Sequence, residues 1–174
     1  LARAGFERMP HFDGFKRLRQ LQQQLEWQDE TLLPWAELCF KEQATVRQPF
    51  NLSSHQDALV RFYLDQERVQ DACDWVVTHK ISPALMLTLA DRIASAKPML
   101  AMSYTFRVAA SYVATSQNDG YEQVVAALRK REQSLGDDQA LQESFSQQLG
   151  ALATEYKRKR NFIKLVNLYF ASRL

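Results

Sequence analysis

Apolar residues recur along this chain at intervals of three and four, the spacing that gathers them on one side of an α-helix. The alternation with a period of two that is typical of half-buried strands is absent, and Ala, Leu, Gln, Glu and Arg dominate the sequence. Only 5 Gly and 5 Pro occur, and they fall at intervals of roughly one helix length. The pattern therefore predicts an all-α protein of about eight or nine helices.

Short polar residues and prolines mark where these helices begin. Asp13 is a candidate N-cap for the first convincing helix, and Ser82 caps a later one in which Pro83 takes the first helical position. Pro34 lies inside the second apolar pattern, where it either kinks a helix or occupies its first turn. The expected helices run approximately from 13 to 25, 28 to 43, 55 to 65, 68 to 78, 83 to 97, 98 to 116 and 121 to 135, and the last starts near 138.

The course of the chain after 138 stays open at the level of sequence. Gly150 stands between two good helix formers with no proline nearby, so the helix either continues through it or breaks there. A second candidate break lies at KRKRN, residues 157–161.

Five residues between 59 and 83 follow a recurring pattern of repeat proteins. Leu59 precedes Tyr63 by four residues, Ala72 follows nine later, Val76 follows Ala72 by four, and Pro83 comes seven after Val76. This spacing resembles the tetratricopeptide repeat, which has a large residue on its first helix, a small residue where two helices cross closely, and a proline at the hairpin end. A small residue such as Ala72 permits the close approach, and the larger side chains fill the groove beside it.

Val60 and His79 depart from the repeat pattern, because smaller residues are usual at these positions. Later helices hold only looser copies, such as VAASYVATSQNDGYEQVVAAL (108–128). Consecutive helices with short connections predict stacked antiparallel hairpins, arranged as a bundle or as an α-solenoid. We expect a tetratricopeptide-like α-solenoid that forms one domain over 1–174, with irregular helices in 1–52 and repeat-like helices in 53–174.

A second resemblance extends over roughly residues 55 to 168. It is carried by FYLDQERVQDACDW (62–75), ISPALMLTLADRI (81–93), a long proline-started helix, GYEQVVAALRKRE (120–132) and YKRKRNFIKLV (156–166), in that order. The chain resembles the C-terminal helical region of bacterial SWIM zinc-finger family proteins. In that family a zinc finger with a CxC and a CxH precedes the helices, and these ligands are absent here.

The SWIM resemblance therefore implies an accessory helical domain and carries no metal site over. The chain begins with Leu rather than Met, which suggests a fragment of a larger protein with the zinc-finger module upstream.

Composition narrows the class of protein further. Hydrophobic residues make up 46% and charged residues 24% of the chain, as is usual for globular domains. No apolar run approaches the ~20 residues that span a bilayer, so we expect a cytoplasmic protein without a membrane partner. Cys39 and Cys73 stand far apart and read as buried residues of a reducing compartment. The net charge of +2 is too small to imply nucleic acid by itself.

Four consecutive cations, 157–160, provide the sharpest candidate for a binding surface. Taken as one helix, the segment places Lys157, Arg160 and Lys164 in one stripe, separate from an apolar arc at Phe162, Ile163, Val166, Tyr169 and Phe170. Arg129, Lys130 and Arg131, from the segment LRKRE, are expected to add to this surface. Two interpretations stay open: a solvated, helix-capping surface, or a stripe that contacts phosphates.

Metal binding, nucleophilic catalysis and nucleotide-phosphate binding find little support in the sequence. The three histidines are isolated, and no metal-binding, nucleophile or phosphate-loop motif occurs. We therefore expect no cofactor and no enzymatic activity. The tryptophans, Trp27, Trp35 and Trp75, serve either as core residues or as anchors in a groove for a partner.

These observations favour a non-catalytic, helical-repeat scaffold that binds a protein or peptide partner. The alternative is a nucleic-acid-binding helical domain that uses the basic stripe. The sequence leaves the oligomeric state and the identity of the partner open.

Overall fold

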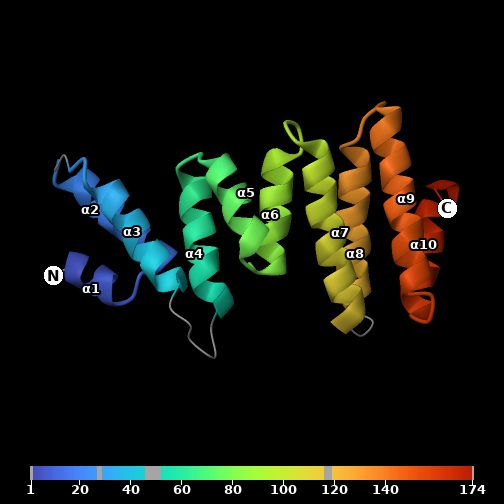
Figure 1. Cartoon of the computed structure of the whole chain (residues 1–174), viewed down its shortest axis with the longest axis horizontal. Helices are drawn as coiled ribbons and strands as arrows, with labels where there is room; N and C mark the ends of the chain where they lie inside the picture. Colours follow the sequence, from blue (N-terminus) through green and yellow to red (C-terminus); the bar gives the residue numbers. More distant parts are fainter. Residues whose placement is uncertain (1, 27–28, 46–51, 116–118, 174) are drawn as a thin grey trace. The chain divides into compact units, whose positions relative to one another are not determined.

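The computed structural model describes residues 2–26, 29–45, 52–115 and 119–173 of the chain (Figure 1). Within these residues all regular structure is helical, which confirms the all-α prediction. Ten α-helices occur in the described ranges, where about eight or nine were expected. They are α1 Ala2–Arg8, α2 Phe12–Gln24, α3 Leu32–Thr45, α4 Leu52–Asp65, α5 Val69–Thr78, α6 Pro83–Ile93, α7 Pro98–Thr115, α8 Asp119–Gln133, α9 Gln139–Glu155 and α10 Arg160–Phe170, followed by a 3-10 turn, η1 Ala171–Arg173.

The helix starts follow the proline and capping signals in most cases. Pro83 and Pro98 open α6 and α7, and Pro34 lies in the first turn of α3, where a missing N–H costs nothing. Asp138 caps α9, because its side chain accepts a hydrogen bond of 3.1 Å from the backbone N–H of Leu141. Trp27, which the sequence analysis names as a candidate anchor, and Ser54, a candidate cap for the helix that follows it, lie outside the residues whose side chains the structure describes.

One expectation at a helix end was wrong, and one open alternative is resolved. Asp13 is not an N-cap: α2 begins one residue earlier, at Phe12, and His11 occupies the capping position without a side-chain hydrogen bond. Gly150 does not break α9, which continues through it to Glu155. The chain breaks instead within the cationic run.

Contacts divide the chain into two compact units, Leu1–Leu85 and Met86–Leu174. The core of the first unit is aromatic. Phe15 lies 5.0 Å from Phe62 and Phe6 lies 5.3 Å from Phe40, both in edge-on arrangements that aromatic rings prefer. These four rings come from α1, α2, α3 and α4, so one cluster holds the four helices together.

The hairpin of α4 and α5 buries the positions that follow the repeat pattern. Leu59 and Tyr63 of α4 and Ala72 and Val76 of α5 all lie in the core. Because Ala72 has only a methyl group, the two helices can approach closely at this point. The small and large residues were thus placed correctly as core residues.

An ion network in the first unit surrounds Glu37 of α3. Its Oε1 accepts hydrogen bonds from Lys41 Nζ at 2.7 Å and from the Tyr63 hydroxyl at 3.2 Å, and both of its oxygens bind the Arg68 guanidinium. Burial opposes the ionisation of Glu37, but the hydrogen bonds and charges of Arg68 and Lys41 outweigh it and lower the pKa of this carboxyl from 4.5 to about 2. The network ties α3 to the loop between α4 and α5.

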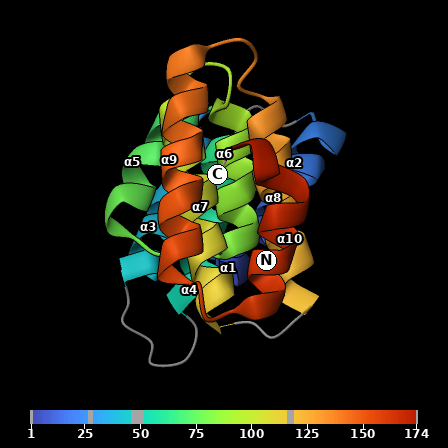
Figure 2. The same cartoon turned by 90° about the vertical axis from the view of Figure 1, so that its right-hand side faces the viewer.

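The second unit is built around α7, which packs against both α8 and α9. Successive helices in this unit run alternately up and down (Figures 1 and 2). Phe145 of α9 lies 5.3 Å from Phe106 of α7 and 6.0 Å from Phe170 of α10, and it has no exposed surface. On a single straight helix residues 145 and 170 would stand about 37 Å apart, so α10 must fold back for its aromatic side chains to be buried.

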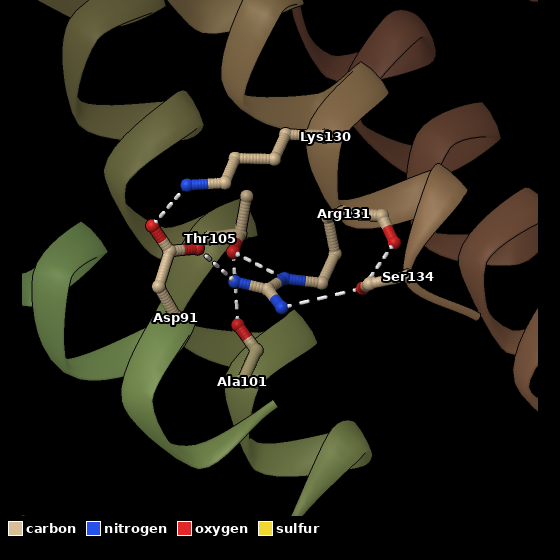
Figure 3. Close-up of polar contacts among 6 residues, drawn as sticks. All are labelled: Asp91, Ala101, Thr105, Lys130, Arg131 and Ser134. Atoms are coloured by element: carbon tan, nitrogen blue, oxygen red, sulfur yellow. Dashed lines mark hydrogen bonds and ion pairs between the residues drawn. The ribbon is translucent and has the colours of Figure 1, made fainter. Parts of the chain in front are cut away.

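A buried arginine links three helices of the second unit (Figure 3). Arg131 of α8 is only 3% exposed, and its Nη2 donates to Asp91 Oδ1 of α6 at 3.0 Å. Its Nε donates to the Thr105 hydroxyl of α7 at 3.1 Å, and its Nη1 lies 3.4 Å from the Ser134 hydroxyl. Burial lowers the pKa of Arg131 and Asp91 opposes this shift, so the guanidinium is held by its partners.

We predict that Glu37→Gln (E37Q) removes a pH-dependent part of the stability. The folded-state pKa of Glu37 lies below its unfolded value, so its contribution is fully present above about pH 4.5 and is lost as the pH falls through about 2. The wild-type protein should exceed E37Q in free energy of unfolding by about 1–3 kcal/mol at pH 7, and the gap should close on acidification. Urea unfolding at several pH values measures it. E30Q, at an exposed carboxylate, is the control, and a pH-independent gap for E37Q would contradict the prediction.

We predict unequal costs for two adjacent cations on α8. Arg131→Ala leaves Asp91 and Thr105 without their buried partner and should lower the free energy of unfolding by about 2–3 kcal/mol. Lys130→Ala removes an exposed ion pair to the same Asp91 and should cost less than about 1 kcal/mol. Urea denaturation of the two variants gives both values. Equal losses would show that the buried network adds nothing to the stability of the unit.

Candidate functional site

The candidate binding surface lies where α8 and α10 run side by side in the second unit (Figure 2). Tyr121 packs against Phe162 at a ring distance of 5.8 Å, and Glu132 Oε1 accepts a hydrogen bond of 2.8 Å from Arg173 Nε, just after α10. Contacts therefore advance in the same direction along both helices, and the two are parallel. The residues of α8 and α10 that face the core are buried. On the solvent-facing side, the line along which the two helices meet forms a seam.

A groove of about 230 Å³ lies along this seam. Its lining is mostly apolar, with one carboxylate and one guanidinium: Glu122, Val125, Ala126 and Arg129 from α8, and Leu165 and Tyr169 from α10. The Arg129 guanidinium stands 4.7 Å over the Tyr169 ring, a cation–π arrangement that closes one end of the groove.

Two large apolar side chains of α10 remain exposed beside this groove. Leu168 is 70% exposed and Tyr169 is 45% exposed. The spacing of apolar residues predicts that Tyr169 shares one apolar arc with Phe162, Ile163, Val166 and Phe170. Of these residues, only Phe162, Val166 and Phe170 are fully buried. The apolar arc is wider than the part of α10 that packs against the core, so Tyr169 stays partly exposed.

The basic stripe expected on one continuous helix is divided by the break between α9 and α10. Lys157 lies in the turn after α9, Lys159 occupies the N-cap position of α10, and Arg160 is the first residue of α10. Lys164 follows one turn later on α10. The backbone N–H of Lys159 donates to the carbonyl of Tyr156 at 2.8 Å, which helps to close the turn.

This break changes the electrostatics of the cationic run. Lys157 and Arg158 follow the negative end of the α9 dipole, where cations are favoured, whereas Arg160 lies at the positive end of the α10 dipole. Lys157, Arg158, Arg160 and Lys164 are all exposed. In the described part of the chain none of the four forms an ion pair. Their charge remains available to an anionic partner.

The three cations of LRKRE, Arg129, Lys130 and Arg131, lie in three different environments. Only Arg129 lines the groove. Lys130 pairs with Asp91 at 2.5 Å, away from α10, and Arg131 is buried in the core rather than exposed, which corrects the reading of LRKRE as one basic surface. Successive residues of a helix point about 100° apart, so three neighbouring cations face three surroundings.

Of the other residues considered from the sequence, Trp35, Trp75 and the two cysteines pack against neighbouring side chains or are buried. Trp75 is half-buried and stacks on His79 with the rings 3.6 Å apart, and Trp35 packs against Phe6. Cys39 and Cys73 are both buried. Across the described ranges no three His, Cys, Asp or Glu side chains come together in a group that could hold a metal ion. None of the described helices is long and apolar enough to cross a membrane.

We predict that opposite sides of the last turn of α10 separate folding from surface function. Phe170→Ala removes a side chain with no exposed surface and should cost about 3–5 kcal/mol in free energy of unfolding. Leu168→Ala changes a side chain that is mostly in water and should stay within about 0.5 kcal/mol of the wild type. Thermal or urea unfolding distinguishes them. A loss for L168A as large as that for F170A would mean that Leu168 is a core residue.

No protein-family model matches the chain, and neither a curated protein nor a solved structure shows significant similarity to it. A function must therefore be inferred from the residues and geometry of this chain.

Proposed function

We propose that this chain is a non-catalytic protein-interaction domain of tetratricopeptide-like helical repeats, and that its α8–α10 groove binds an acidic, amphipathic segment of a partner protein. One observation carries the proposal: exposed Tyr169 lines a groove of apolar and charged side chains, and exposed Leu168 precedes it on the same helix as Arg160 and Lys164, cations that have no ion-pair partner in the described part of the chain.

The apolar part of the groove supplies affinity for a partner. Burying a leucine-sized side chain fully stabilises a complex by roughly 1.5–3 kcal/mol. Leu168 and Tyr169 stand on consecutive positions of α10, and the small, exposed Ala126 lines the groove from α8. A seam between two parallel helices suits a ligand helix that inserts apolar residues at i, i+3, i+4 and i+7.

The charged rim supplies the preference for an acidic segment. Arg129 closes the groove, and Arg160 and Lys164 lie on the exposed side of α10. Glu122 is the one carboxylate among the residues that line the groove. Complementary charge at a rim mainly raises the association rate and excludes partners of the wrong sign.

The repeat-like character of the chain supports an interaction role rather than catalysis. The hairpin of α4 and α5 buries the tetratricopeptide-like positions, and helical hairpins of this kind present extended surfaces for partners. The lining of the α8–α10 groove contains no Ser, Cys, Lys or His that could act as a nucleophile or base. Its polar groups are suited to recognition.

The resemblance to the SWIM zinc-finger family adds an expectation about context. We propose that the domain is accessory to a zinc-binding module encoded upstream of it, in a cytoplasmic bacterial protein. A CxC followed by a CxH in the upstream reading frame would support this, and an upstream sequence without these ligands would refute it.

Nucleic-acid binding is the second candidate function. It is favoured by the exposed cations Lys157, Arg158 and Arg160, which surround the turn between α9 and α10 and carry no ion pair within the described ranges. Tyr169 offers a ring on which a base could stack. A phosphate-binding surface would show a steep loss of affinity as salt rises, because bound counterions are released.

We predict that a labelled helical peptide with Leu at i, i+3, i+4 and i+7 and Glu at its flanking positions binds with micromolar affinity by fluorescence anisotropy. The same peptide with Lys in place of Glu should bind at least about tenfold more weakly. Leu168→Asp should reduce binding about tenfold or more and Lys164→Ala about two- to fivefold, because they remove the apolar anchor and a rim charge.

Lys130→Ala is the matched control, since it removes an exposed lysine that faces Asp91 instead of the groove. It should leave affinity unchanged. Absence of binding by the acidic peptide, or equal losses for K130A and K164A, would refute the proposed site. Binding of a single- or double-stranded oligonucleotide in the same titration, weakened by K157E and R160E, would favour the second candidate; no oligonucleotide binding even at low salt would exclude it.

A further inference from the structure

The first unit contains a larger pocket with the opposite charge. It has a volume of about 450 Å³, within the range of ligand-binding pockets, and it lies between α1 and α3. Glu7 comes from α1, and Trp35, Leu38, Cys39, Glu42 and Gln43 come from α3. The apolar wall is accessible, since Leu38 is 55% exposed.

The charged groups that line this pocket are both carboxylates. Glu7 Oε1 accepts a hydrogen bond of 3.3 Å from the Trp35 indole Nε1, which positions this carboxylate at the indole edge. Burial, together with the charges of Glu7 and Glu42, raises the pKa of the Cys39 thiol on the pocket wall. Both carboxylates line the same pocket as this thiol.

Two cations on the helices that form this pocket, Arg3 of α1 and Lys41 of α3, pair with carboxylates outside the pocket lining. Arg3 pairs with Asp29 at 2.5 Å and stacks over the Trp35 ring at 4.9 Å. Lys41 of α3 pairs with Glu37, one turn earlier on the same helix, at 2.7 Å. Among the described residues no ion pair neutralises Glu7 or Glu42.

We propose that this pocket is a second docking site, which receives an arginine or lysine side chain from a basic segment of a partner protein. Its occupant has an aliphatic stem to lie along Leu38 and Trp35 and a cationic head to meet Glu7 and Glu42. Arginine fits best, because its planar guanidinium both stacks on aromatic rings and donates paired hydrogen bonds to carboxylates.

This inference goes beyond the proposed α8–α10 site and does not depend on it. The two sites belong to different units, α1 and α3 in one and α8 and α10 in the other, and they select partners of opposite charge. A domain with both sites would bring an acidic and a basic partner segment together.

The test uses the full chain, labelled with ¹⁵N, and the peptide Gly-Ser-Leu-Arg-Leu-Ser-Gly. The control peptide carries citrulline in place of arginine, which keeps the shape and removes the charge. We expect a saturable shift of the Trp35 indole N–H signal, assigned with W35F, while the Trp75 signal stays in place. The citrulline peptide should bind at least about tenfold more weakly, because it loses the charge-assisted hydrogen bonds.

Variants then locate the site. E7Q/E42Q neutralises both pocket carboxylates at constant volume and should weaken the arginine peptide about tenfold or more. E30Q/E155Q removes two exposed carboxylates outside the pocket and should leave binding unchanged. Circular dichroism checks that each variant is folded. The citrulline comparison needs no variant and stays decisive if one of them fails to fold.

Three results would overturn the proposal: no saturable shift of the Trp35 signal, equal affinity for the arginine and citrulline peptides, or unchanged binding to E7Q/E42Q. A Trp35 shift that grows with protein concentration without peptide, and disappears in K157E/R160E, would also overturn it. In that case the occupant would be the cationic turn of a second copy of this chain and not a separate partner.

Discussion

The structure depends on one constraint, which is that each helix must bury its apolar side against its neighbours. In α10 this side consists of Phe162, Val166 and Phe170, and each of these side chains is fully buried. Phe170 reaches Phe145 only because the chain reverses between α9 and α10. The same reversal divides the cationic run and leaves its charges exposed around a turn. Burial of the core therefore decides where the candidate binding surface lies.

Arg131 shows how a charged residue can serve this packing instead of interrupting it. Its guanidinium is buried among groups of α6, α7 and α8, so the polar cost of burial is offset by hydrogen bonds and by Asp91. The neighbouring residues then take other roles: Lys130 pairs with the exposed side of Asp91, and Arg129 stacks on Tyr169. Arg131 thus faces the interior together with the apolar side of α8, while Arg129 lines the groove.

The two pockets differ in chemistry, and the residues that line them explain the difference. The groove of the second unit combines Leu165 and Tyr169 with Arg129, whereas the pocket of the first unit combines Leu38 with Glu7 and other polar groups. Both join apolar side chains to charged ones: the groove pairs Arg129 with Glu122, whereas the charged groups of the pocket are both carboxylates. Charge can then select a partner while burial of apolar surface binds it.

The sequence by itself determined the helical class, the helix starts at Pro83, Pro98 and Asp138, and the core role of Ala72, because these depend on local capping, periodicity and side-chain size. It missed α1, which is too short for a periodic pattern to show. Only the tertiary structure decided that Arg131 is buried, that Leu168 and Tyr169 are exposed, and that Glu7 and Glu42 share one pocket. Helix formation follows from neighbours along the chain, whereas burial and convergence of side chains depend on which helix faces lie against each other in space.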